Sequence, residues 1–188
     1  MQKTTAKLYF NETAILNRRE NLKPAPHNPA KRTSCLPNPS PSCAKKIRQV
    51  CDTLLAAVRR AGLPDDCLNW LYFADSTTEA FSDGITITYR DYDPHAPYRH
   101  ITAERGTIYR DEGAADLHRF LYYPLQDITH YIAGQYELDH RQPDQDFRRI
   151  LFAKQLELLA AIHPDYAAWR KAEIDTVLQQ HPYRDNAA

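Results

Sequence analysis

Apolar residues between positions 47 and 58 recur at the three- and four-residue intervals of one helical face. The residues on this face are Ile47, Val50, Cys51, Leu54, Leu55 and Val58. Gly62 follows the pattern and Pro64 comes shortly after it, which is a typical stop signal for a helix. The pattern therefore predicts an amphipathic helix that ends at Gly62.

The next segment has the two-residue period of β-strands. Ile85, Ile87 and Tyr89 alternate with polar residues, which predicts a half-buried strand. Short apolar or aromatic segments predict further strands at 69–73, 98–103 and 107–110, with turns at 82–84 and 104–106. The links between the last three strands are short, which favours antiparallel pairing, because parallel neighbours need longer crossovers.

Beyond the strands, the apolar spacing returns to that of helices. Asp116 is a suitable cap for the first of three helices, and Pro124 predicts a kink or a break within it, because proline cannot donate a backbone hydrogen bond. A second helix is expected to begin at Asp144 or Gln145, and a third with Pro164 in its first turn. The predicted fold class is α+β, with an N-terminal helix, a small antiparallel β-meander and three C-terminal helices packed on the sheet.

Residues 1–44 differ in composition from the rest of the chain. Six of the 13 prolines fall between Pro24 and Pro41, and seven Lys or Arg face only two acidic residues. Proline fixes φ and lacks a backbone donor, so helix and sheet form poorly in such a segment. We expect residues 1–44 to be a disordered, basic extension and residues 45–188 to be a single α+β domain.

The overall net charge of zero conceals an acidic domain. Residues 45–188 contain 17 Lys or Arg and 22 Asp or Glu, a net charge of −5. A nucleic-acid-binding protein normally carries a basic surface, so we expect no nucleic-acid partner. No apolar run reaches the ~18 residues of a membrane span, and the first residues lack the apolar core of a signal peptide. We therefore expect a cytoplasmic protein with no membrane partner.

Motifs of the common enzyme classes are absent from the sequence. None of the five glycines lies in a phosphate-binding frame, and neither G-x-S-x-G nor H-E-x-x-H occurs. The four cysteines form no C-x-x-C pair, which argues against a zinc ribbon. The absent motifs argue against nucleotide and acyl-transfer chemistry, although a triad of distant residues stays open, and we expect no cofactor or metal.

One constellation supports an alternative, a small metal-dependent hydrolase that uses His130, Glu137 and His140. Asp127 with His130, and Glu137 with His140, have the i, i+3 spacing of paired ligands on one helical face. His130 and His140 would lie about 15 Å apart along a helix, too far to share one ion. Surface or interhelix hydrogen bonds are therefore the simpler explanation for these residues.

The C-terminal helices carry a longer pattern. Its segments are QDFRRILFAKQLELL at 145–159, YELDHR at 136–141, ERG at 104–106, AEI at 172–174 and HPY at 181–183. Together these segments resemble the immunity protein 63 family of bacterial polymorphic toxin systems, over roughly residues 45–185. We assign a structural role to the residues of this motif, which are Glu137, His140, Arg141, Asp146, Phe147, Arg148, Arg149 and Lys154.

The resemblance implies a function as well as a fold. Such a protein binds a cognate toxin domain encoded by a neighbouring gene and protects the producing cell without catalysing a reaction. The expected mechanism is occlusion of the toxin's active site, with acidic groups steering association and a few aromatic anchors holding the complex. An oligomeric structural adaptor is a third interpretation of the sequence.

Contact residues are expected in the loop at 91–98. Its Asp91, Tyr92, Asp93 and Tyr98 combine negative charge with aromatic side chains, and two prolines stiffen it. Tyrosine is enriched at protein interfaces, and the chain has twelve tyrosines. An ordinary hairpin loop would have a similar composition, so the sequence leaves both interpretations open.

Overall fold

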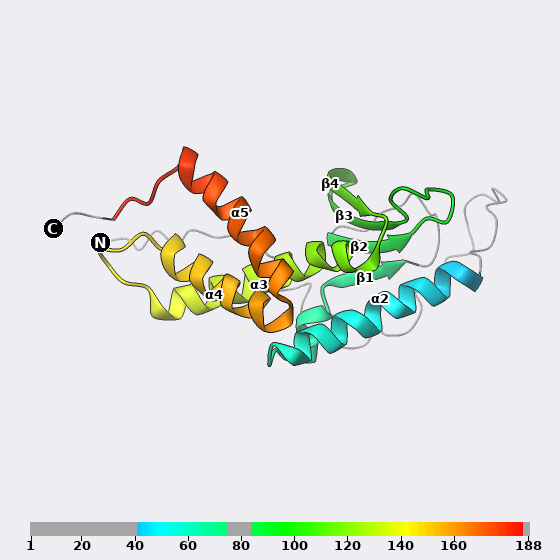
Figure 1. The fold of residues 1–188 in the computed structure, drawn as a ribbon, viewed down its shortest axis with the longest axis horizontal. Coiled ribbons are helices and arrows are strands. Elements are labelled where there is room, and N and C mark those ends of the chain that lie inside the picture. Colours follow the sequence, from blue (N-terminus) through cyan, green and yellow to red (C-terminus); the bar gives the residue numbers. More distant parts are fainter. Residues whose placement is uncertain (1–40, 75–83, 186–188) are drawn as a thin grey trace. The chain divides into compact units, whose positions relative to one another are not determined.

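The computed structural model describes residues 41–74 and 84–185 (Figure 1). In chain order these form α2 (Pro41–Arg60), the short 3-10 helix η1 (Asp65–Leu68), β1 (Leu71–Ala74), β2 (Gly84–Tyr89), β3 (Tyr98–Glu104), β4 (Thr107–Ala114), α3 (Leu117–His140), α4 (Arg148–Ile162) and α5 (Pro164–Gln180). Most of the predicted extension and most of the predicted turn at 82–84 lie outside the described residues. Because α2 begins at Pro41, residues 41–44 of that predicted extension are helical.

The sheet has four strands in the order β1-β2-β3-β4. The strands β2, β3 and β4 form the predicted antiparallel meander, and its tight turn holds Arg105 at a φ of 51° and Gly106 at 75°. Strand β1 instead pairs parallel with β2, so the sheet is mixed. The hydrophobic pattern indicated that this short segment is a strand, but it carried no information on its direction.

The main hydrophobic core lies between the sheet, α2 and the first half of α3. Its fully buried side chains come from each of these elements and include Val50, Leu54, Val58, Ile87, Phe120, Leu125 and Ile128. The helix face predicted for α2 is therefore confirmed. Thr86 and Thr88 are buried as well, so β2 is buried on both faces and is more than half-buried.

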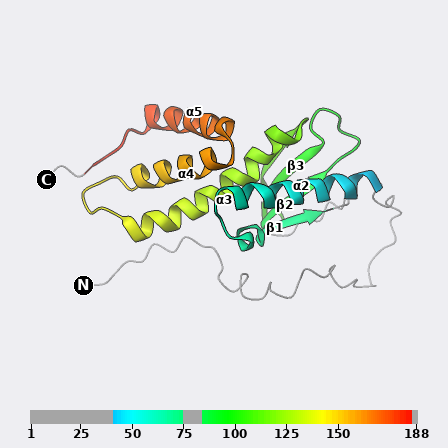
Figure 2. The same ribbon diagram turned by 60° about the horizontal axis from the view of Figure 1, so that its bottom comes forward.

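Helix α3 extends beyond the sheet, and its second half packs against α4 and α5 (Figure 2). A second, smaller core in this region contains Ala133, Leu151, Phe152 and Ile174. The α+β class is confirmed, but α4 and α5 pack mainly on α3 and on each other rather than on the sheet. The cause is the length of α3, since 24 residues span about 36 Å and exceed what the sheet can cover.

Pro124 does not break α3, which is continuous from Leu117 to His140. A proline inside a helix removes one backbone hydrogen bond and costs about 3 kcal/mol. Phe120 and Leu125 lie on either side of Pro124, and both are fully buried. Burial of a large apolar side chain contributes roughly 1.5–3 kcal/mol, so the packing on both sides outweighs the cost of the proline.

Local side-chain chemistry sets the starts of two helices. The Asp116 carboxylate accepts a hydrogen bond of 2.8 Å from the Arg119 N–H, which confirms the predicted cap of α3. Helix α5 begins with Pro164 at its first position, as expected. Nδ1 of His163 caps this helix by accepting a hydrogen bond of 3.1 Å from the Asp165 N–H.

Gly113 lets the connection between β2 and β3 lie directly against β4. A Cβ atom at this position would come within 2.7 Å of the Ala96 Cβ and within 2.7 Å of Nη1 of Arg99. The arginine could move, but the Ala96 Cβ is fixed to the backbone. The glycine therefore holds the loop and β4 in register with each other.

We expect Gly113→Ala to lower the free energy of unfolding by about 1–3 kcal/mol, because the added methyl group overpacks this contact. Chemical denaturation measures the change. Gly134→Ala is the matched control, because a Cβ at Gly134 meets no atom within 4 Å. Gly134 lies inside α3, so alanine there should stabilise by up to about 1 kcal/mol. Equal effects of the two substitutions would contradict the role of Gly113.

Candidate functional site

The connection Asp91–Pro97, called here the β2–β3 loop, is fixed by its own hydrogen bonds. The Arg90 N–H donates to the Pro97 carbonyl at 2.7 Å and closes the loop. The Asp93 carboxylate accepts from the N–H groups of His95 at 3.2 Å and Ala96 at 3.1 Å. Asp93 therefore organises the loop from within, and its carboxylate is less available to a partner than its charge suggests.

Two of the predicted contact residues lie at the surface of this loop and one does not. Tyr92 is 65% exposed, and Asp91 is also exposed. Tyr98, in contrast, is only 5% exposed, because its ring packs between Phe120 at 5.4 Å and Tyr89 at 5.0 Å. The structure thus corrects the assignment of Tyr98, which belongs to the core and has no surface to offer a partner.

The family-motif residues near the end of α3 form a surface stack and an ion pair between a buried Glu137 and an exposed Arg141. Glu137 is 2% exposed, and its two carboxylate oxygens each accept a hydrogen bond of 2.7 Å from Arg141. His140 stacks on Tyr136 with ring centroids 3.9 Å apart, and the ammonium group of Lys154 lies 4.9 Å from the same Tyr136 ring. The contact between Lys154 and Tyr136 joins the end of α3 to α4.

Asp146 is the centre of a second set of motif contacts. Its carboxylate accepts hydrogen bonds from Nε of Arg148 at 2.9 Å and from Nη2 of Arg148 at 2.6 Å. It also accepts from the backbone N–H groups of Arg148 and Arg184. Because Asp146 is used in this way, α4 begins at Arg148, slightly later than the sequence predicted.

The arginines of this motif bind the segment that follows α5. Arg148 donates to the carbonyl oxygens of His181 and Pro182, each at 2.9 Å. Arg149 pairs with the Asp185 carboxylate at 2.7 Å and lies over the Tyr183 ring at 4.1 Å. We call this arrangement the C-terminal clasp; it consists of Asp146, Arg148, Arg149 and residues 181–185. It connects the start of α4 to the chain beyond α5, while Phe147 remains exposed beside it.

The clasp strongly favours ionised carboxylates. The hydrogen bonds from Arg148 hold the pKa of Asp146 well below its usual range, with further support from the backbone N–H groups of Arg184 and Arg148. Arg149 likewise lowers the pKa of Asp185. The clasp is therefore intact at neutral pH and is weakened only by strong acid.

The structure does not assemble the ligand set of the alternative, a metal-dependent hydrolase. Both oxygens of Glu137 are occupied by Arg141. The Nδ1 atom of His140 is bonded to the Tyr136 carbonyl, and His130 is a further ten positions back on the continuous helix α3. These three residues therefore do not form a common site.

A buried polar cluster between the sheet and α3 escaped prediction from the sequence. His100 of β3 is fully buried, with Nε2 3.2 Å from the Asp127 carboxylate and Nδ1 3.7 Å from that of Glu112. Arg110 of β4 lies 2.9 Å from each of these carboxylates. Burial alone would raise the pKa of Asp127, but the contacts with His100 and Arg110 outweigh burial and lower it.

The cluster continues as a polar seam through the helices. Arg110 also donates to the Gln126 side chain at 3.3 Å, and the fully buried Gln155 of α4 donates to the Gln126 carbonyl at 3.0 Å. Arg170 of α5 then donates to the Gln155 side chain at 3.0 Å. The seam therefore joins β4, α3, α4 and α5. The polar groups of the seam are bonded to one another, and these hydrogen bonds fix how the four elements pack.

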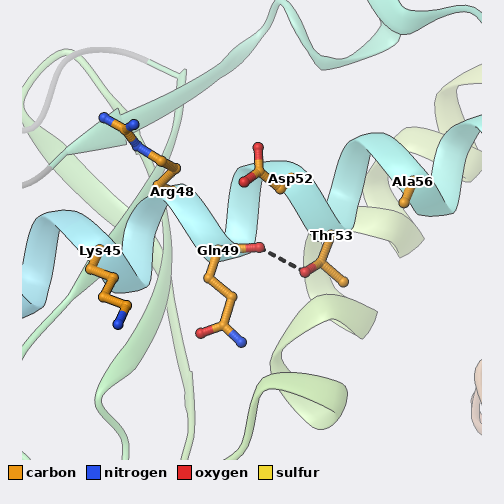
Figure 3. Close-up of a pocket in the computed structure, with 6 residues that line it drawn as sticks. All are labelled: Lys45, Arg48, Gln49, Asp52, Thr53 and Ala56. Atoms are coloured by element: carbon orange, nitrogen blue, oxygen red, sulfur yellow. Dashed lines mark hydrogen bonds between the residues drawn. The ribbon is translucent and has the colours of Figure 1, made fainter.

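A hollow on the outer side of α2 offers little chemistry. It has a volume of about 570 Å³ and is lined by Lys45, Arg48, Gln49, Asp52, Thr53 and Ala56, all from this one helix (Figure 3). The Thr53 hydroxyl already donates to the Gln49 carbonyl at 2.7 Å. Within the described residues, no second element brings converging groups to this hollow.

Comparison with family models supports the resemblance seen in the sequence. The model of the family described as Immunity protein 63 matches residues 94–176. This segment runs from the β2–β3 loop through most of α5, and the match supports the resemblance to the immunity protein 63 family that the sequence indicated. Comparisons with curated proteins and with solved structures gave no match. Among the described residues, no helix is both long and apolar enough to cross a membrane.

We expect Asp146→Asn to lower the free energy of unfolding by about 1.5–3 kcal/mol, because the arginine and the backbone donors of the clasp lose a charged acceptor. Chemical denaturation measures the loss. Asp144→Asn, two positions away on the exposed surface, is the control and should change stability by no more than about 0.5 kcal/mol.

The pH dependence of that difference gives a second measure of the clasp. In the unfolded chain the Asp146 carboxyl has an ordinary pKa of about 3.9, and in the folded protein its pKa is lower. Its stabilising contribution is therefore complete above about pH 5 and is lost as the pH falls below about 4. A stability difference between wild type and D146N that does not shrink in acid would argue against the ionised clasp.

Proposed function

We propose that this protein is an immunity protein that binds a cognate bacterial toxin and neutralises it by occluding the toxin's active site. The match of residues 94–176 to the immunity protein 63 family is the observation that supports this proposal. The partner is a toxin domain encoded by a neighbouring gene, and the place of action is the cytoplasm. Protection is assigned to the domain 45–188 rather than to the extension 1–44, because the matched segment lies within that domain.

The proposed mechanism requires no reaction on the part of this chain. A stoichiometric blocker needs a surface that keeps its shape, since each side chain ordered on binding costs about 0.5–1.5 kcal/mol. The polar seam and the C-terminal clasp supply that rigidity for the helices. The internal hydrogen bonds of the β2–β3 loop supply it for the segment that carries the proposed contacts.

We place the centre of the contact surface at Tyr92, with Asp91 beside it. Tyr92 is exposed on a loop that is already ordered, so its ring can enter a pocket of the toxin with little loss of entropy. The acidic side chains of this loop and the net charge of −5 of residues 45–188 would steer the domain towards a basic toxin surface. Asp93 contributes to this surface mainly by holding the loop in place.

Co-expression with the product of the adjacent gene tests the function. We expect growth of cells that produce the toxin to be restored, and the two proteins to purify together in a fixed ratio. An empty vector and an unrelated acidic protein serve as controls. Unprotected cells, or turnover of the toxin's substrate by the isolated protein, would rule out stoichiometric blocking.

We expect Tyr92→Ala to weaken toxin binding by at least about 2 kcal/mol, which corresponds to roughly 30-fold in Kd. Tyr109→Ala is the matched control. Tyr109 is 67% exposed, but it lies on β4 beside the end of β3 that is farther from the β2–β3 loop. Calorimetric titration of the purified toxin with each variant measures the change. If the two variants bind equally well, Tyr92 is not the anchor.

A further inference from the structure

Three potential metal ligands meet where the first turns of α3 and α5 approach each other. His118 lies in the first turn of α3, and His163 and Asp165 lie at the start of α5. Nε2 of His118 is 3.0 Å from the Asp165 carboxylate, and Nδ1 of His163 is 3.6 Å from the same oxygen. One ligand atom from each residue lies within 4.8 Å of the others.

Neighbouring side chains hold the His118 ring in one orientation. The Tyr166 hydroxyl donates to the His118 carbonyl at 3.0 Å and lies 3.1 Å from Nδ1 of the same ring. The Tyr166 ring also stacks on His118 with centroids 4.9 Å apart, and Trp169 packs edge-on at 5.5 Å. Because Nδ1 faces Tyr166, the nitrogen that remains for a ligand is Nε2, which points to Asp165.

We propose that His118, His163 and Asp165 bind one divalent transition-metal ion of the zinc type, with Nδ1 of His163 exchanging its capping hydrogen bond from the Asp165 N–H for the ion. Two imidazole nitrogens and one carboxylate oxygen suit zinc, whereas magnesium and calcium prefer oxygen ligands alone. The separations of 3.0 Å and 3.6 Å from the Asp165 oxygen suit ligand atoms that share one ion at bonds of about 2.0–2.2 Å. A fourth position stays open for water or for a side chain of another protein.

The arrangement around these residues resembles the outer shell of known metal sites. Histidine ligands typically bond through their second nitrogen to a neighbouring group that fixes the ring, and Tyr166 is placed to do this for His118. Metal binding needs the lone pair of Nε2 of His118, so any proton held between this nitrogen and Asp165 would be released to solvent. Asp116 and Asp165 add negative charge at the first turns of α3 and α5, which offsets the positive ends of the two helices.

The consequence of binding would be a cross-link between two distant parts of the chain. His118 and Asp165 are 47 positions apart, and a shared ion would tie the start of α5 to the start of α3. The site lies on different elements from the β2–β3 loop. The proposal is therefore independent of the proposed function, and its failure would leave the immunity function untouched.

Titration of the full-length, tag-free protein with zinc chloride, followed by calorimetry, tests the site. We expect one ion per chain and a rise in Tm in its presence. Cobalt(II) serves as a spectroscopic probe, and its absorption should lack the thiolate bands that ligation by the cysteines would produce. The absence of binding, or thiolate ligation, would overturn the proposal.

Variants that keep the fold identify the ligands. His163→Asn retains a helix-capping side chain but removes the imidazole, and His118→Gln keeps a polar side chain beside Asp165. We expect both to lose zinc affinity by more than the roughly 10- to 100-fold loss expected for Tyr166→Phe, which removes only the outer-shell hydroxyl. His181→Asn, an exposed histidine elsewhere, is the control and should bind zinc normally. Circular dichroism checks that each variant is folded. Undiminished binding in both ligand variants would show that zinc binds elsewhere.

Discussion

The pairing of Asp127 with His100 and Arg110 is the interaction on which the arrangement of this domain depends. A largely covered carboxylate that lost its partners would destabilise the fold, and this favours the position of α3 on the sheet that brings these groups together. Once the first half of α3 is fixed in this way, its second half extends past the sheet. That half then provides the surface on which α4 and α5 pack.

Much of the fold follows from the order of residues along the chain. The apolar face of α2, the antiparallel meander, the Asp116 cap and the Pro164 start were all predictable, because each depends on neighbours within a few positions. The direction of β1 and the packing of α4 and α5 were not, because both depend on contacts between distant segments. Pro124 shows the same limit, since a local preference for a break yields to packing on both sides of it.

The candidate sites divide along the same line. Sequence alone placed a contact loop around Tyr92 and a structural motif around Asp146 and Arg148; Tyr92 is exposed, and Arg148 is hydrogen-bonded to Asp146. The sequence could not place Tyr98 in the core. Tyr98 is the first residue of β3, and its side chain is buried although much of the loop before it is exposed. The polar cluster at His100 was also out of reach, since only the pairing of His100 with Glu112 across two strands reveals it.

The C-terminal clasp also has a consequence for how the protein is made. Asp146 acquires the backbone donor of Arg184 only after 38 further residues have been synthesised. Until then, the nascent chain at the ribosome lacks the segment that completes the small core around Leu151 and Ile174. The sheet and the first half of α3 can assemble earlier, so the domain should mature in two stages, and a chain truncated before Arg184 would contain its helices but not the completed clasp.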